Sequence, residues 1–198
     1  MKRNSMSHTD REGMIATSFL FIYILMSYVF VYWTKTMSNA TVSRENLAVN
    51  IVMYLLPCAF ILVMCVYREA RVESLGMNSK GLAILLILLI LSLTFYTSNL
   101  LLKILMVVIC EEIVFRGYAS ERLKAAYGSI GSIIVAGFIL GISYSLIPMV
   151  NWNITIADFL LYIGLGITTQ AILQRMNNYF GNIYLSILIH ASILLLVL

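Results

Sequence analysis

The sequence predicts an all-α fold, a polytopic integral membrane helical bundle with about seven transmembrane helices. The first observation is composition: 61% of the 198 residues are hydrophobic and only 11% are charged. Soluble domains carry about a quarter charged residues. The second observation is that the apolar residues gather in runs of about 20, the length that a helix needs to cross the hydrocarbon. We therefore expect the lipid bilayer to surround the chain.

The apolar runs divide the chain into seven expected crossings. The first three are charge-free, and the fourth can form a helix if its charged residues are sheltered inside the bundle. Pro148 and the Asn-Trp-Asn run that follows predict a turn after the fifth. The expected helices span about Gly13–Thr34, Asn46–Tyr67, Gly81–Leu102, Leu100–Tyr118, Ser129–Ile147, Thr155–Leu173 and Gly181–Leu198. Residues 1–99 would then hold three N-terminal helices, and residues 100–198 would form a core of four.

The positions of the basic residues predict the orientation in the membrane. If the N-terminus lies inside, ten of the thirteen Lys and Arg fall on the inner side, which leaves Lys35, Arg44 and Lys103 outside. This asymmetry follows the positive-inside rule. We expect a multi-pass protein of the cell membrane with a cytoplasmic N-terminus and an external C-terminus. The net charge of +4 is then a topology signal and gives no reason to expect a nucleic-acid partner.

Several residues within the apolar runs are best explained by packing. Pro57 removes a backbone donor and should kink the second helix. Gly137 and Gly141 form a small-xxx-small pair that permits close helix approach. Asp158 and Lys103 fall near helix ends, as interface residues do. The cysteines are expected to pack rather than form a disulfide; they are Cys58, Cys65 and Cys110.

Ionisable side chains concentrate in the fourth and seventh expected helices. Glu112 and Arg116 stand four residues apart on one helical face and should pair. Glu111 points about 100° away from them. At 1.5 Å per residue, Glu111 and His190 lie roughly 10 and 13 Å from the same membrane face, so the two can meet. Burial disfavours the charged form of a carboxylate, which suits Glu111 to act as a general base.

These ionisable residues could also serve purposes other than acid–base chemistry. The ion pair alone could anchor a helix end at the interface, with His190 hydrogen-bonded inside the bundle. A zinc site is disfavoured because the membrane segments hold a single histidine. A proton-coupled transporter is disfavoured because the buried charges do not recur along a path. The sequence also lacks the HExxH, GxSxG, Walker and CxxC motifs.

The run Glu111–Tyr118, which reads EEIVFRGY, resembles the motif of the CAAX prenyl endopeptidase and bacteriocin-processing family of intramembrane proteases, also called the Abi or CPBP family. The resemblance covers roughly Leu100–Leu198, and Arg71–Met77 is similar to a segment that often precedes the family core. It implies a base role for Glu111 and supporting roles for Glu112 and Arg116. It also implies that His190 is the oxyanion donor.

Two positions depart from the family pattern. Tyr144 stands where the family has the histidine of FxxxH, and Leu194 stands where it has a polar residue four places after His190. A phenol donates a hydrogen bond but does not readily take a proton at neutral pH. A leucine side chain does neither. Loss of one oxyanion donor typically costs a factor of about 100 to 1,000 in rate.

Two functional hypotheses follow. The first is an intramembrane endopeptidase that uses Glu111, Glu112, Arg116, Tyr144 and His190 on membrane-delivered peptides such as bacteriocin or pheromone precursors, without cofactor or metal. The second is a catalytically inactive relative that binds a membrane peptide or membrane protein in immunity or regulation.

Overall fold

The computed structural model of the chain describes residues 8–38, 41–43, 46–67, 75, 77–96 and 100–197. Helices account for nearly all of these residues, and no strand occurs among them. Two elements, η1 and η3, are π-helical. In chain order the helices are α1 (His8–Ser38), α2 (Leu47–Asn50), η1 (Ile51–Leu55), α3 (Leu56–Tyr67), α4 (Ser79–Thr94), α5 (Leu100–Glu111), η3 (Glu112–Ser120), α6 (Glu121–Val150), α7 (Ile156–Phe180) and α8 (Tyr184–Val197). The all-α prediction is confirmed for the described residues.

Four helical stretches within the described residues are long and apolar enough to cross a membrane. They are Asp10–Met37, Leu47–Cys65, Leu100–Val150 and Ile156–Phe180. The third contains two of the expected crossings, α5–η3 and α6. Two further apolar helices, Lys80–Thr94 and Tyr184–Leu195, are shorter. The helices therefore suit a lipid environment, while the count of seven crossings and the orientation of the termini stay predictions.

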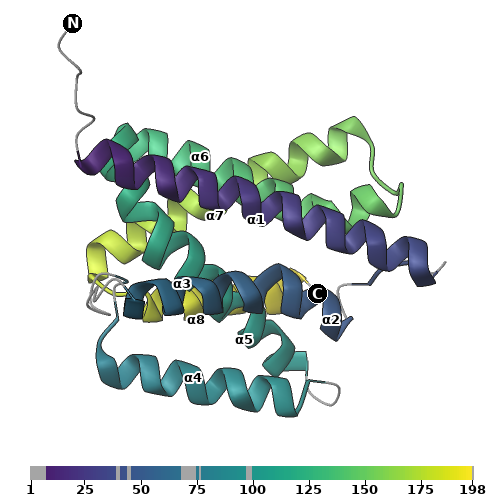
Figure 1. Ribbon diagram of the computed structural model, residues 1–198, viewed down its shortest axis with the longest axis horizontal. Helices are drawn as coiled ribbons and strands as arrows, with labels where there is room; N and C mark the ends of the chain where they lie inside the picture. Colours follow the sequence, from purple (N-terminus) through teal and green to yellow (C-terminus); the bar gives the residue numbers. More distant parts are fainter. Residues whose placement is uncertain are drawn as a thin grey trace, which may run out of the picture.

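The helices form two layers with a connection between them (Figure 1). In one layer α6 packs between α1 and α7. The second layer contains α3 and α8, and α4 lies beyond it in this view. The α5–η3 rod runs obliquely from the second layer into the first, and it contacts α4, α8 and α6 on its way. This course carries its charged residues into the middle of the bundle.

Several expected helix ends were wrong. They had been placed at charged residues, which indicate where the lipid ends, whereas capping residues determine where a helix ends. The third run breaks after Thr94, so Gly81–Leu102 is not one helix. α6 begins at Glu121 and is interrupted at Gly128, whose φ is 73°. α7 continues past Arg175 to Phe180 and ends at the left-handed cap Gly181. Pro148 lies in the last turn of α6 rather than in the following turn.

The second helix departs from α geometry near its proline. The π-helical turn Ile51–Leu55 comes just before Pro57, whose missing N–H leaves that turn one donor short. The three cysteines are buried. Of the segment Arg71–Met77, only Leu75 and Met77 lie within the described residues. The backbone of Leu75 lies against Gly117, where an added Cβ would be 3.0 Å from the Leu75 carbonyl oxygen.

The close helix approach predicted at Gly137 and Gly141 is confirmed. A Cβ on Gly141 would lie 2.6 Å from the Cα of Ile163 in α7. Gly166 on α7 completes the contact, because its Cβ would lie 2.4 Å from the carbonyl oxygen of Gly137. Real Cβ atoms do not come this close to backbone, so the α6–α7 contact depends on these three glycines.

We expect Gly166→Ala to destabilise the protein by about 1–3 kcal/mol, because the added methyl group must push α6 and α7 apart. Thermal melting and the amount of monodisperse protein in detergent measure this loss. Gly164→Ala, two residues away, is the matched control, since a Cβ there meets nothing within 4 Å. Equal melting temperatures for the two variants would contradict the close contact.

Candidate functional site

Three charged side chains lie at the junction of α5 and η3. Glu111 is the last residue of α5, and Glu112 and Arg116 belong to η3. Their exposed fractions are 1%, 0% and 0%. The charged side chains that the fourth expected helix must keep away from lipid are therefore buried inside the bundle. The sequence predicted a regular α-helix through Tyr118, whereas Glu112–Ser120 is π-helical, a geometry that is frequent at functional sites.

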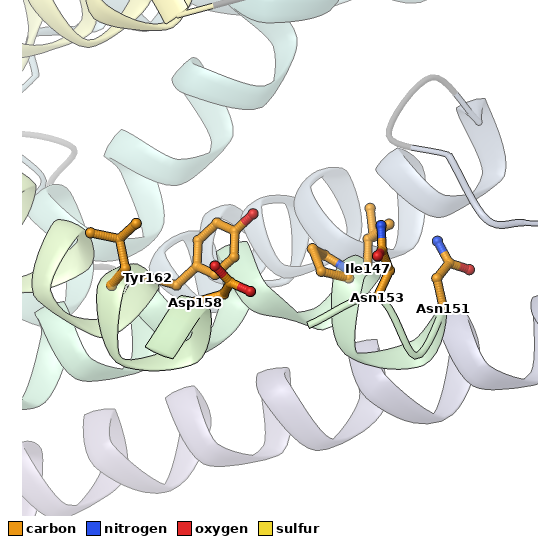
Figure 2. A pocket seen from close by; sticks show the side chains of 7 residues that line it. Ile147, Asn151, Asn153, Asp158 and Tyr162 are labelled. Atoms are coloured by element: carbon orange, nitrogen blue, oxygen red, sulfur yellow. The ribbon is translucent and has the colours of Figure 1, made fainter. Parts of the chain in front are cut away.

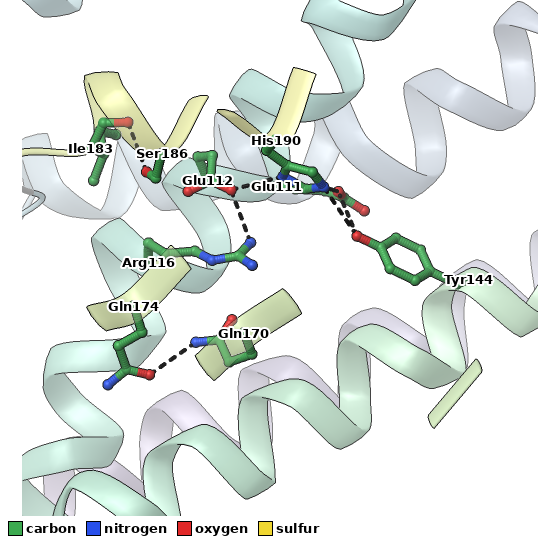
Figure 3. Close-up of polar contacts among 9 residues, drawn as sticks. All are labelled: Glu111, Glu112, Arg116, Tyr144, Gln170, Gln174, Ile183, Ser186 and His190. Carbon is green, nitrogen blue, oxygen red and sulfur yellow. Dashed lines mark hydrogen bonds and ion pairs between the residues drawn. The ribbon is translucent and has the colours of Figure 1, made fainter. Parts of the chain in front are cut away.

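Glu112 binds two partners through one carboxylate oxygen (Figure 3). Its Oε1 lies 3.1 Å from Arg116 Nη1 and 2.8 Å from His190 Nδ1. Because a carboxylate only accepts, Nδ1 carries the proton in this contact. The Glu112–Arg116 contact agrees with the sequence prediction. The contact of His190 with Glu112 was missed, because the sequence pattern paired His190 with Glu111 alone.

The Nε2 side of the His190 ring lies close to Glu111 and Tyr144. The Nε2 atom of His190 lies 3.2 Å from the Tyr144 hydroxyl and 3.6 Å from Glu111 Oε2. The Tyr144 hydroxyl donates to Glu111 Oε2 at 3.4 Å. Four elements thus bring all five sequence-predicted site residues together: α5, η3, α6 and α8. In Figure 3, dashed contacts join these five residues into one network that runs from Arg116 to Tyr144.

The charges of this cluster are nearly balanced. Two carboxylates face one guanidinium, so one negative charge remains unless a further proton is shared among Glu111, Tyr144 and His190. Burial of an unbalanced charge at membrane depth costs at least a few kcal/mol. Such a cluster holds a proton close to several acceptors, which is the arrangement that acid–base chemistry requires.

Leu194 lies outside this network. It follows His190 by four residues on α8, is half-buried, and packs against the apolar core. Its side chain supplies no polar group to the cluster. The structure thus places one replaced family position, Tyr144, at the centre of the network and the other among apolar neighbours.

A set of buried polar residues beside Arg116 was not predicted from the sequence. Gln170 and Gln174 are the only glutamines in the chain, and their exposed fractions are 0% and 1%. They stand four residues apart in an apolar helix, which is the sequence signal that could have identified them. Figure 3 shows both on the side of Arg116 that faces away from His190.

The space beside Glu111 on the side of α1 and η1 is closed. A gap there is lined by Tyr23, Met53, Tyr54 and Phe115, among others, and is too small for a water molecule. The Tyr23 hydroxyl lies 3.0 Å from Ser143 Oγ, so this contact joins α1 to α6 beside the gap. A peptide that approaches Glu111 from this side must therefore displace side chains.

A separate pocket of about 390 Å³ lies at the turn between α6 and α7 (Figure 2). It contains none of the five predicted site residues. Asp158 lines it and also caps α7, accepting from the Thr155 backbone N–H at 3.0 Å. Lys103 lies in the first turn of α5 with its Nζ 5.4 Å from the centre of the Tyr96 ring. Both residues are near helix ends, as the sequence indicated.

The side-chain positions bear on metal binding as well. Within the described part of the chain, no three His, Cys, Asp or Glu side chains are placed to hold a metal ion.

Residues 92–196 match the model of the type II CAAX prenyl endopeptidase Rce1-like family. This region covers more than half of the chain and includes all five residues of the cluster, so the chain belongs to this family. No curated protein and no solved structure gives a significant match. At family level the chain is a CAAX-protease-like intramembrane protein.

Proposed function

We propose that the chain is a glutamate-dependent intramembrane endopeptidase that hydrolyses a peptide bond in a membrane-delivered peptide. The observation that carries this proposal is the meeting of Glu111, Tyr144 and His190 within 3.2–3.6 Å of one another. The positive-inside pattern further supports a place in the cell membrane with a cytoplasmic N-terminus and an external C-terminus.

In the proposed reaction Glu111 takes a proton from a water molecule, and the oxygen of that water attacks the carbonyl carbon of the scissile bond. The carbonyl oxygen becomes an oxyanion, which hydrogen bonds from Tyr144 and from protonated His190 would stabilise. Glu111 then returns the proton to the nitrogen of the leaving amine as the C–N bond breaks. The products are a free carboxyl group and a free amine.

Glu112 and Arg116 act through His190 in this scheme. The 2.8 Å contact of Glu112 with Nδ1 fixes the orientation of the imidazole, so that Nε2 faces Glu111 and Tyr144. Arg116 holds Glu112 at 3.1 Å and balances its charge.

A second candidate function, binding without catalysis, is favoured by a specific observation. The Tyr144 hydroxyl lies between Glu111 and His190, the region that the attacking water needs, and Leu194 offers no second oxyanion donor. A chain of this kind could hold a membrane peptide or a membrane protein and act in immunity or regulation.

Glu111→Gln is the test that separates the two functions. If the chain is a protease, the variant should lose cleavage of a membrane peptide precursor by a factor of about 100 or more, because the amide cannot take a proton. The assay uses purified protein in proteoliposomes and follows the peptide by mass spectrometry. Glu121→Gln, at an exposed glutamate that pairs with Lys124 at 3.9 Å, is the control. A biological effect that survives Glu111→Gln unchanged would instead support binding alone.

A further inference from the structure

A row of buried polar side chains leads from the surface toward the cluster. Gln170 Nε2 donates to Gln174 Oε1 at 3.2 Å, and Gln174 Nε2 donates to Ser132 Oγ at 3.0 Å. All three residues are at most 1% exposed. Buried polar side chains of this kind are costly in a membrane protein, and they face bundle interiors or water-filled paths.

The outer end of this row reaches the surface at the start of α6. Ser132 Oγ donates to the carbonyl of Ser129 at 2.9 Å, and Ser129 is exposed. The preceding residue is Gly128, where the positive φ interrupts the helix. Ser129 is therefore the exposed end of the row.

The inner end of the row is incomplete. The Nε and Nη2 atoms of Arg116 are buried and have no hydrogen-bond partner among the described residues. The same holds for Gln170 Oε1. Figure 3 shows the guanidinium between Glu112 and the Gln170–Gln174 pair, and η3 contacts α7. In this view two unpartnered donor groups of Arg116 and the unpartnered acceptor of Gln170 lie on the same side of the guanidinium. Nearly all buried polar groups in proteins find a partner.

We propose that ordered water fills this position, bridging Arg116 to Gln170, and that the row from Ser129 to Arg116 is the path by which water reaches the cluster. A water molecule accepts from the guanidinium and donates to Gln170 Oε1, so it satisfies both groups. An anion cannot donate to Gln170, and Arg116 repels a cation.

Another wall of the cluster supports this direction of supply. On the side of α1 and η1, the gap beside Glu111 has no room for a water molecule. The α7 side, by contrast, offers polar groups from the surface inward. The water site itself is independent of catalysis, while its role as a supply path rests on the proposed hydrolysis.

An experimental structure of the full chain in lipid, at a resolution that resolves ordered water, tests the site directly. We expect at least one water within hydrogen-bond distance of both Arg116 and Gln170. In Gln170→Met, a variant of similar size without the acceptor, that water should be absent or displaced. A direct Arg116–Gln170 hydrogen bond would overturn the proposal, as would anomalous scattering from bromide at the position.

The supply role is tested by kinetics, provided that the parent cleaves a peptide. Gln170→Met should lower kcat about tenfold, the effect of losing one hydrogen bond in the path, with little change in KM. Thr168→Val is the control, because Thr168 lies on the exposed face of α7. An unchanged kcat in Gln170→Met would overturn the supply path. If the parent is inactive, the proposed protease function fails, and the structural experiment alone decides the water site.

Discussion

Arg116→Ala should cost the protein about 3–5 kcal/mol of folding stability, because it leaves Glu112 buried and charged without its guanidinium partner. The Glu112–Arg116 distance is 3.1 Å and both side chains are 0% exposed, so bulk solvent does not screen the charge that remains on Glu112. We expect little folded protein to accumulate in membranes. The yield and the thermal melting of the purified variant measure this effect, separately from any loss of activity.

Two comparisons make this prediction specific. Arg122→Ala removes a partly exposed arginine that lies 3.6 Å from Glu12, and it should cost only about 1 kcal/mol. The double variant Glu112→Gln with Arg116→Met removes both charges, keeps an acceptor for His190 Nδ1, and should restore part of the yield. If Arg116→Ala melts like the parent, the pair has no structural role.

The sequence predicted those features that depend on residue spacing within one element. Runs of about 20 apolar residues identified α1 and α7, and the four-residue spacing identified the Glu112–Arg116 pair. The ends of α6 and α7 were misplaced because charged residues at a membrane surface do not end a helix. Arg175 continues α7, whereas the left-handed Gly181 ends it.

The contacts between elements were harder to predict. The sequence predicted that His190 lies at a membrane depth similar to that of Glu111. The rotation of α8 about its axis decides which glutamate the Nδ1 atom of His190 contacts. Glu111 and Glu112 are adjacent, and the π-helix begins between them, so a regular helical wheel does not give their directions. The preference of His190 Nδ1 for Glu112 therefore emerges only from the packed structure.

The role of Gln170 and Gln174 shows a second limit. Two glutamines four residues apart are compatible with a surface stripe or with a buried row. Their burial is decided by Gly166, which lets α7 lie directly on α6. A sequence search for polar residues that follow a small-residue contact on the same helical face would have found them.

The last prediction concerns the two positions at which the chain departs from its family. Tyr144→His with Leu194→Asn should produce or raise peptide cleavage. A histidine is shorter than a tyrosine, so it leaves space for water beside Glu111, where the Tyr144 hydroxyl now lies 3.4 Å from Oε2. An asparagine at position 194 stands one turn from His190 and can donate a second hydrogen bond to the oxyanion, worth a factor of about 100 to 1,000.

The assay compares parent, both single variants and the double variant in proteoliposomes with one peptide precursor. Tyr162→His is the control, because Tyr162 lines the separate pocket between α6 and α7. Cleavage that appears only in the double variant, and disappears again when Glu111→Gln is added, would identify a retired protease scaffold. Robust cleavage by the parent that Glu111→Gln abolishes would contradict the inactive alternative. A folded double variant that cleaves no better than the parent would show that these two positions do not limit catalysis. Glu111, Glu112 and His190 would then have both missing family residues beside them, and cleavage would still not increase.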